Sequence, residues 1–183
     1  MIPGALARRY ARAIFGLAVE KKLEDKVQVE LQQFGEAFGE SEELERVLVS
    51  SQIPLDVRRK VLVQVARRMA LSDLAVKCLS FVLDKGRMEG IQDIARSMKR
   101  MVDDRLNRID AVVVTASPIG VGDGARLKRE LERITGKTVV LEQKVDPSII
   151  GGATTRVGNV LFDGSIRNYL EEARRSLAGG SNQ

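Results

Sequence analysis

The spacing of the apolar residues changes near Leu106, and this change limits what the chain can fold into. Before it, apolar residues recur every three or four positions in runs interrupted by Gly, Ser and Pro, which is typical of short amphipathic helices. After it comes the run Ala111–Val114, which is rich in β-branched residues and favours a buried strand. The two patterns predict an α+β protein with two domains, residues 1–105 and 106–183.

Six helices are predicted in the first domain. Ser41 and Ser72 are suited to cap the third and fifth helices, and Pro54 is suited to the first turn of the fourth, with Val57 and Leu62 among its inward residues. Connections this short favour a helical bundle. The expected ranges run from about Leu6 to Leu17, Leu23 to Phe38, Ser41 to Leu48, Pro54 to Val65, Ser72 to Val82, and Met88 to Leu106.

The second domain is expected to be a small α/β unit with a short sheet and two helices. A strand over residues 109–115 is followed by a glycine-containing loop and a helix with Leu127, Leu131 and Ile134 inward, which Gly136 stops. A second strand begins at Thr138. The closing helix is expected from five apolar residues at helical spacing, Ile166, Tyr169, Leu170, Ala173 and Leu177.

Between the second strand and the closing helix, turn-forming dipeptides separate short apolar runs. Proline supplies a fixed φ and glycine supplies positive φ, so we expect tight turns and a compact β meander. Ser165 is also suited to cap the closing helix. The residues assigned to turns are Asp146, Pro147, Gly151, Gly152, Gly158, Asp163, Gly164 and Ser165.

Composition argues against membrane insertion and against nucleic-acid binding. Charged residues interrupt the apolar ones throughout, so no stretch approaches the roughly 20 apolar residues that a membrane-spanning helix needs. The net charge is +5, but it is spread over both domains, and with aromatic residues at 4% few side chains could stack on bases. We expect a soluble protein, and a single cysteine, Cys78, fits a reducing cytoplasm.

The residue inventory also argues against catalysis. The chain contains no histidine, which removes the commonest general base and metal ligand. Cys78 lies among Leu74, Leu79, Phe81 and Val82, where burial raises a thiol pKa and makes it unreactive. We therefore expect no catalytic residue, no metal and no cofactor.

One segment suggests an alternative, a dinucleotide-dependent enzyme. Gly120, Gly122 and Ala125 satisfy the pattern Gly-x-Gly-x-x-Ala after a strand and before a helix, and Glu142 lies near the end of the next strand. Against this reading, Pro118 and the loop length separate strand and helix more than the fingerprint turn allows. Too little chain follows to complete a doubly wound sheet.

The first helix is apolar on more than one side. One stripe contains Leu6, Tyr10, Ala13, Ile14 and Leu17, and we expect it to face the bundle. The opposite side carries Ala7, Ala11, Phe15 and Ala18. Such a helix is either surrounded by others in the bundle or in contact with a helix of another protein, and the residues alone leave both possibilities open.

Four motifs in order resemble the delta subunit of bacterial F-type ATP synthase, whose mitochondrial counterpart is the oligomycin-sensitivity-conferring protein. They are residues 10–15, Lys85-Gly86-Arg87, residues 115–118, and a C-terminal set formed by 145–152, 157–159 and 163–167. The resemblance therefore extends from end to end. One departure is Asn159, where the family usually carries Asp, and Asn suits a turn equally well.

The resemblance implies a non-catalytic subunit of the peripheral stalk, or stator, on the cytoplasmic face of the bacterial plasma membrane. The N-terminal bundle would bind the N-terminal segment of an alpha subunit in a groove between its first and fifth helices. The C-terminal domain would bind the C-terminal end of the b-subunit stalk. The groove residues implied are Tyr10, Ala11, Ile14, Phe15, Leu74, Lys77, Cys78 and Phe81. A dinucleotide-dependent enzyme and a basic nucleic-acid-binding adaptor are the alternative functions.

Overall fold

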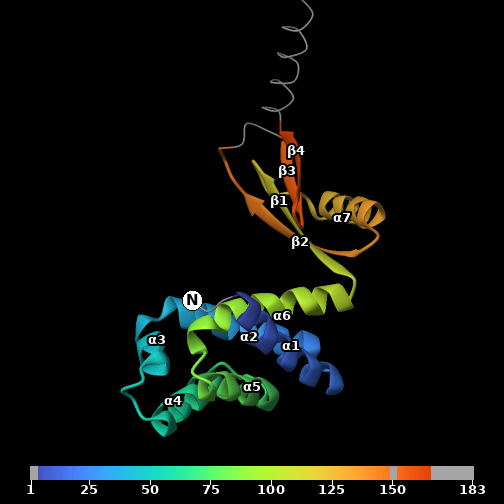
Figure 1. The fold of residues 1–183 in the computed structure, drawn as a ribbon. Helices are drawn as coiled ribbons and strands as arrows, with labels where there is room; N and C mark the ends of the chain where they lie inside the picture. Colours follow the sequence, from blue (N-terminus) through green and yellow to red (C-terminus); the bar gives the residue numbers. More distant parts are fainter. Residues whose placement is uncertain (1–3, 149–151, 166–183) are drawn as a thin grey trace, which may run out of the picture. The chain divides into compact units, whose positions relative to one another are not determined.

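A computed structural model describes residues 4–148 and 152–165 of the chain. The chain divides into two compact units, Met1–Arg105 and Leu106–Gln183, drawn in Figure 1. The first is helical and the second is built around a sheet, which is the α+β composition expected from the sequence.

The described part of the first unit holds six α-helices, as expected. A single 3-10 turn, η1 (Met88–Gly90), precedes the last of them, where the sequence predicted continuous α-helix. Gly86 adopts a positive φ of 63° and ends α5, so the chain restarts with a tighter turn. The α-helices are α1 (Gly4–Glu20), α2 (Glu24–Glu40), α3 (Glu42–Val49), α4 (Leu55–Arg68), α5 (Asp73–Asp84) and α6 (Ile91–Arg105).

Hydroxyl caps begin two of these helices, as predicted. Ser41 Oγ accepts a hydrogen bond from the Leu44 N–H at 3.2 Å, and Ser72 Oγ accepts one from the Ala75 N–H at 3.3 Å. The carboxylate of Glu30 on α2, which is only 7% exposed, accepts from the Ser72 backbone N–H at 3.1 Å and from its hydroxyl at 2.5 Å. These two hydrogen bonds satisfy the buried carboxylate of Glu30 and connect α2 to the N-terminus of α5.

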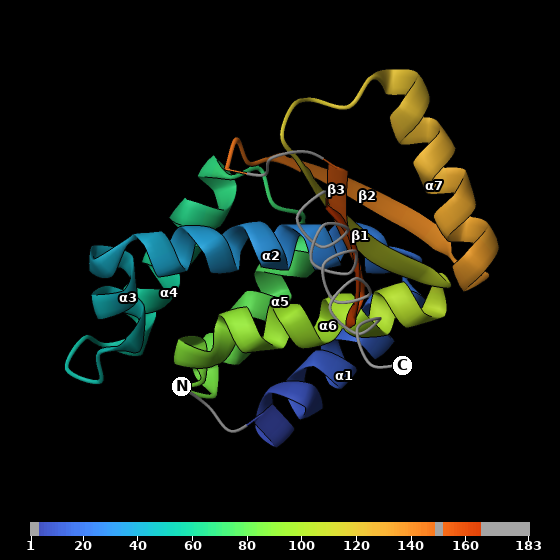
Figure 2. The same cartoon turned by 90° about the horizontal axis from the view of Figure 1, so that it is seen from above.

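The core of the first unit lies where α1 and α2 pack against α6 (Figure 2). Phe34 from α2 and Met98 from α6 are fully buried there. The α2 backbone comes close to α6, because a Cβ added to Gly35 would lie 3.6 Å from Gln92 Cα. The Gln92 side-chain amide donates to the Gly35 carbonyl oxygen at 3.1 Å.

On α4 the predicted orientation of one residue is wrong. Val57 is 41% exposed, whereas Leu62 and Ala66 are fully buried. The predicted stripe, which is Val57, Val61, Leu62 and Val65, is wider than the face that the bundle covers, so the residue at its margin lies in solvent.

The second unit is a four-stranded sheet with one described helix on one of its faces. The strand order is β2-β1-β3-β4, with β1 and β2 parallel and the other two pairs antiparallel. Its elements are β1 (Arg108–Thr115), α7 (Val121–Thr135), β2 (Thr138–Val145), β3 (Gly152–Val157) and β4 (Val160–Ser165).

Helix α7 covers one face of this sheet. Leu127 and Leu131 pack against Ala111, Val139 and Val157. Gly136 ends the helix with φ 65°, as expected. Ile134 was expected to point inward but is 64% exposed. It follows Leu131 by three residues, and the narrow contact with the sheet leaves this margin of the helix uncovered.

The hairpin between β3 and β4 turns at Gly158, which has φ 57°. Pro147 also lies in a turn, and Asp146 Oδ1 accepts a hydrogen bond from the Ser148 N–H at 2.9 Å. Gly152 begins β3 with φ 86°. Gly151 and the expected closing helix lie outside the described residues.

The turn expected at Asp163 and Gly164 is wrong. Both residues, with Ser165, belong to β4, where Asp163 pairs with Thr154 and Gly164 with Ala153. Their turn preference is local, whereas the antiparallel pairing that starts at Val157 continues hydrogen bonds along the whole of β3.

Candidate functional site

Helix α1 buries the face opposite to most of the predicted stripe. Ala7, Ala11, Ile14 and Ala18 are at most 3% exposed, whereas Leu17 is 39% exposed. Small alanine side chains allow close approach to neighbouring helices, so the larger residues are left at the edge of the contact. Of the implied groove residues, Ala11 and Ile14 therefore belong to the core.

An exposed apolar surface lies where α1 meets α5. The rings of Tyr10 and Phe81 are in contact, with centroids 5.9 Å apart and planes tilted by 49°. Phe81 is nevertheless 42% exposed. Leu17 follows Tyr10 by seven residues and Leu74 precedes Phe81 by seven, so each lies on the same side of its helix as the ring. We call Tyr10, Leu17, Leu74 and Phe81 the α1–α5 strip.

The α1–α5 strip includes only part of the residue set implied by the resemblance. Tyr10, Leu74 and Phe81 belong to it, and Lys77 is exposed on α5. Cys78 is 4% exposed and lies in the core. Phe15 is partly buried on the other side of α1, five residues after Tyr10. Leu17 was absent from the set, although its seven-residue distance from Tyr10 was a signal for including it.

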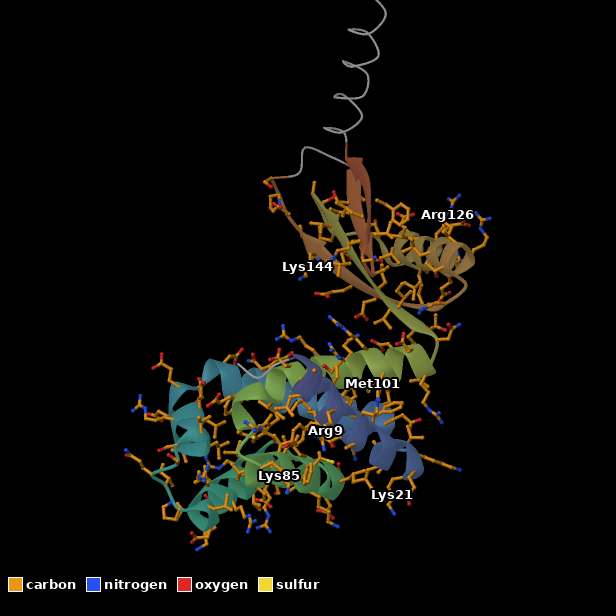
Figure 3. The ribbon with its side chains drawn as sticks, in the orientation of Figure 1. Arg9, Lys21, Lys85, Met101, Arg126 and Lys144 are labelled. Atoms are coloured by element: carbon orange, nitrogen blue, oxygen red, sulfur yellow. The ribbon has the colours of Figure 1, made fainter. Side chains whose placement is uncertain are left out.

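The charge at one end of the strip is positive. The Lys85 Nζ lies 5.8 Å from the centroid of the Phe81 ring, which is within the range of a cation–π contact. Arg9, next to Tyr10, is exposed. Figure 3 labels both, Arg9 on α1 and Lys85 immediately after α5.

The Cys78 thiol is poorly suited to chemistry. Burial raises its pKa from 9.0 to about 11, so thiolate is scarce near neutral pH. This supports the expectation that Cys78 is an unreactive residue.

We predict that Cys78 reacts with iodoacetamide at pH 8 about 100-fold more slowly in the folded chain than in urea, because the raised pKa lowers the thiolate fraction by that factor. The folded-state pKa lies above the unfolded one, so the stability this thiol contributes is present below about pH 9 and is lost as the pH rises toward 11. Mass spectrometry of the alkylated chain measures both rates. Equal rates with and without urea would show that Cys78 is accessible.

The glycine segment lacks the geometry of a dinucleotide site. Gly120 is the N-cap of α7 with φ −60°, and Gly122 and Gly124 lie in the first turn of that helix. A Cβ at either of the latter two would meet nothing within 4 Å, so neither glycine is needed for a close approach. The described sheet has a single parallel pair of strands, unlike the doubly wound sheet that forms a dinucleotide crevice.

Within the described residues, no cluster of three or more acidic or cysteine side chains could hold a metal ion. No helix among these residues is long and apolar enough to cross a membrane. The α1–α5 strip exposes aromatic and aliphatic side chains side by side, which is the chemistry of a protein contact.

Comparisons with known proteins agree over nearly the whole chain. A model of the ATP synthase delta (OSCP) subunit family matches residues 6–177. The chain is 35% identical over 179 residues to an ATP synthase subunit delta from Myxococcus xanthus, covering 97% of this chain and 98% of the relative. It is 33% identical over 180 residues to the same subunit from Geobacter metallireducens, covering 98% and 100%.

The fold is also similar to a solved structure. A chain in the cryo-EM structure of the Toxoplasma gondii mitochondrial ATP synthase hexamer superposes with a TM-score of 0.65 at 19% identity. The match covers 94% of this chain and 97% of that chain, so it includes both structural units.

Proposed function

The chain belongs to the ATP synthase delta (OSCP) subunit family, and on this basis we propose that it joins the alpha/beta head of the enzyme to the b-subunit stalk. It is a non-catalytic stator subunit of the peripheral stalk of an F-type ATP synthase. A stator resists the torque that the rotor exerts on the catalytic head during proton-driven ATP synthesis. A slowly dissociating contact at each end suits this role.

The first contact is with the N-terminal segment of an alpha subunit, and the exposed α1–α5 strip is the observation that supports it. Phe81 and Leu17 are 42% and 39% exposed on a unit whose other large apolar side chains are mostly buried. An amphipathic helix laid along the strip would cover these residues, which is the helix-in-groove mode of recognition. Apolar burial would supply most of the affinity.

The second contact joins residues 106–183 to the C-terminal end of the b-subunit stalk. Helix α7 covers only one face of the sheet. The other face presents Val140 and Leu161, which are 47% and 61% exposed, and their neighbours Val112 and Val114 are only partly buried. No described helix covers this face, and its apolar residues, which lie beside the exposed charges of Glu142 and Arg156, support an interaction with a further helix.

Through these two contacts the chain would lie at the cytoplasmic face of the plasma membrane as a peripheral part of the complex. It would bind neither a nucleotide cofactor nor nucleic acid in this role. The geometry of the Gly120 segment disfavours the dinucleotide alternative, and the dispersed charge disfavours the nucleic-acid adaptor.

A pull-down from cell membranes tests this function. We expect the tagged chain to recover the alpha, beta and b subunits. The double variant Leu17→Asp with Phe81→Asp should lose alpha and beta but keep b, because two carboxylates in an apolar contact have no partner there. Quantitative mass spectrometry of the recovered subunits measures the result.

Val29→Asp is the matched control, since Val29 is 44% exposed on the outer side of α2. Circular dichroism should show unchanged helix content in both variants. Equal recovery of alpha in the double variant and in the control would rule out the strip as the docking surface. Recovery of none of the three subunits by the unmodified chain would contradict the stator function.

A further inference from the structure

Tyr10 and Phe81 each have an exposed cation close to them in the sequence, Arg9 on α1 and Lys85 just after α5. Lys85 follows Phe81 by four residues and holds its Nζ 5.8 Å from the ring centroid. Arg9 adjoins Tyr10 in the sequence and is exposed, like Lys85. Lys85 therefore places a positive charge against one end of the α1–α5 strip, and Arg9 is an exposed cation next in sequence to the Tyr10 ring that contacts Phe81.

The nearest carboxylate in the sequence does not neutralise this end. Asp84 adjoins Lys85, but its Oδ1 accepts a hydrogen bond and ion pair from Arg59 Nε on α4 at 2.8 Å. Neither Arg9 nor Lys85 forms an ion pair with any residue that the structure describes. Lys77 differs, because Asp73 lies four residues before it on the same side of α5.

An apolar side chain of a docked segment that contacts Phe81 must compete with the Lys85 ammonium for the exposed face of the ring. The ammonium then loses its ring contact and part of its hydration, which is unfavourable unless an anion replaces them. A carboxylate on the incoming segment would supply that anion. A neutral residue at the same position would supply no anion, and a cation there would be repelled by the Lys85 ammonium.

We propose that the segment docked on the α1–α5 strip is an amphipathic helix with a carboxylate within one turn of the apolar residue that it places on Phe81, held by Lys85 and Arg9. This inference rests on the proposed docking function of the strip and adds the chemical class of its partner. The apolar residues give affinity, and the charge sets the register and the orientation of the helix.

Binding of designed peptides to the full chain tests the proposal. The probes are fluorescently labelled, terminally blocked 18-residue peptides with one shared Leu stripe on an Ala/Gln background. The peptides differ only in the residue that lies one helical turn before or one helical turn after the central Leu. This residue is Glu, Gln or Lys. We expect a Glu peptide to bind about tenfold more tightly than its Lys counterpart in 50 mM NaCl, with Gln between them. The difference should shrink in 500 mM NaCl because salt screens exposed charges.

Charge reversal in the protein identifies the cations. In the variant Arg9→Glu with Lys85→Glu, the Lys peptide should become the tighter ligand. The control variant Lys60→Glu with Arg67→Glu reverses two exposed charges on α4 and should leave the original order unchanged. Fluorescence anisotropy measures each Kd, and a double-mutant cycle between peptide and protein charge isolates their coupling.

The outcomes separate this inference from the docking function. Equal affinities for the Glu and Lys peptides, with binding abolished by Phe81→Asp, would overturn the charge assignment and leave the strip as a docking surface. The same preference for Glu after Arg9→Glu with Lys85→Glu would also overturn it. Binding of no peptide, or binding unaffected by Phe81→Asp, would reject the strip as a docking surface and the inference with it.

Discussion

Replacing Ala11 by Asp is expected to unfold the helical unit. Ala11 is fully buried on α1, between Ala7 and Ile14 in the core. A carboxylate there would need space that the core lacks and would lie in an apolar site without a partner, at a cost on the order of 5 kcal/mol. This is comparable to the entire stability of a small domain. Far-ultraviolet circular dichroism should show a large loss of helix at 25 °C.

Ala13→Asp is the matched control, because Ala13 is exposed two residues further along the same helix. It should change the unfolding free energy by no more than about 0.5 kcal/mol. If Ala11→Asp kept full helix content and lost only partner binding, Ala11 would line a docking surface, as the family resemblance implied. The structure instead favours the interpretation of α1 as a helix with its alanine face in the bundle core.

Phe34→Ala is expected to destabilise the helical unit by about 3–5 kcal/mol, because Phe34 is among the largest fully buried side chains and leaves a cavity. The sheet of Leu106–Gln183 should be unaffected, since its core of Ala111, Leu131, Val139 and Val157 is separate. Hydrogen exchange should therefore accelerate in α2 and α6 while protection in β1 stays constant.

The exposed residue Val29 on the same helix again provides the comparison, and Val29→Ala should change stability by less than about 0.5 kcal/mol. Faster exchange in β1 in the Phe34→Ala variant would contradict the division into two independently folded units. A loss of protection in both units to the same extent would mean that they unfold as one cooperative structure.

Local signals predicted the architecture well. Ser41 and Ser72 cap the helices that follow them, and Gly136 ends α7 in the left-handed conformation, because these preferences involve only neighbouring backbone groups. The β-branched run at Ala111–Val114 lies inside β1 for a similar reason. Asp163 and Gly164 show the limit of this reasoning, since pairing with the distant residues of β3 overrides their turn preference.

The sequence by itself determined the order of helices and strands, the change from helical bundle to sheet near Leu106, and, through its motifs, the family. The tertiary structure alone decided which side of α1 is buried. Both sides of that helix are apolar, so periodicity could not distinguish them, and close packing selected Ala7, Ala11 and Ala18 for the interior. The same packing left Leu17 and Phe81 at the surface and brought Tyr10 on α1 into contact with Phe81 on α5, because neighbours on different helices are set by the fold and not by sequence spacing.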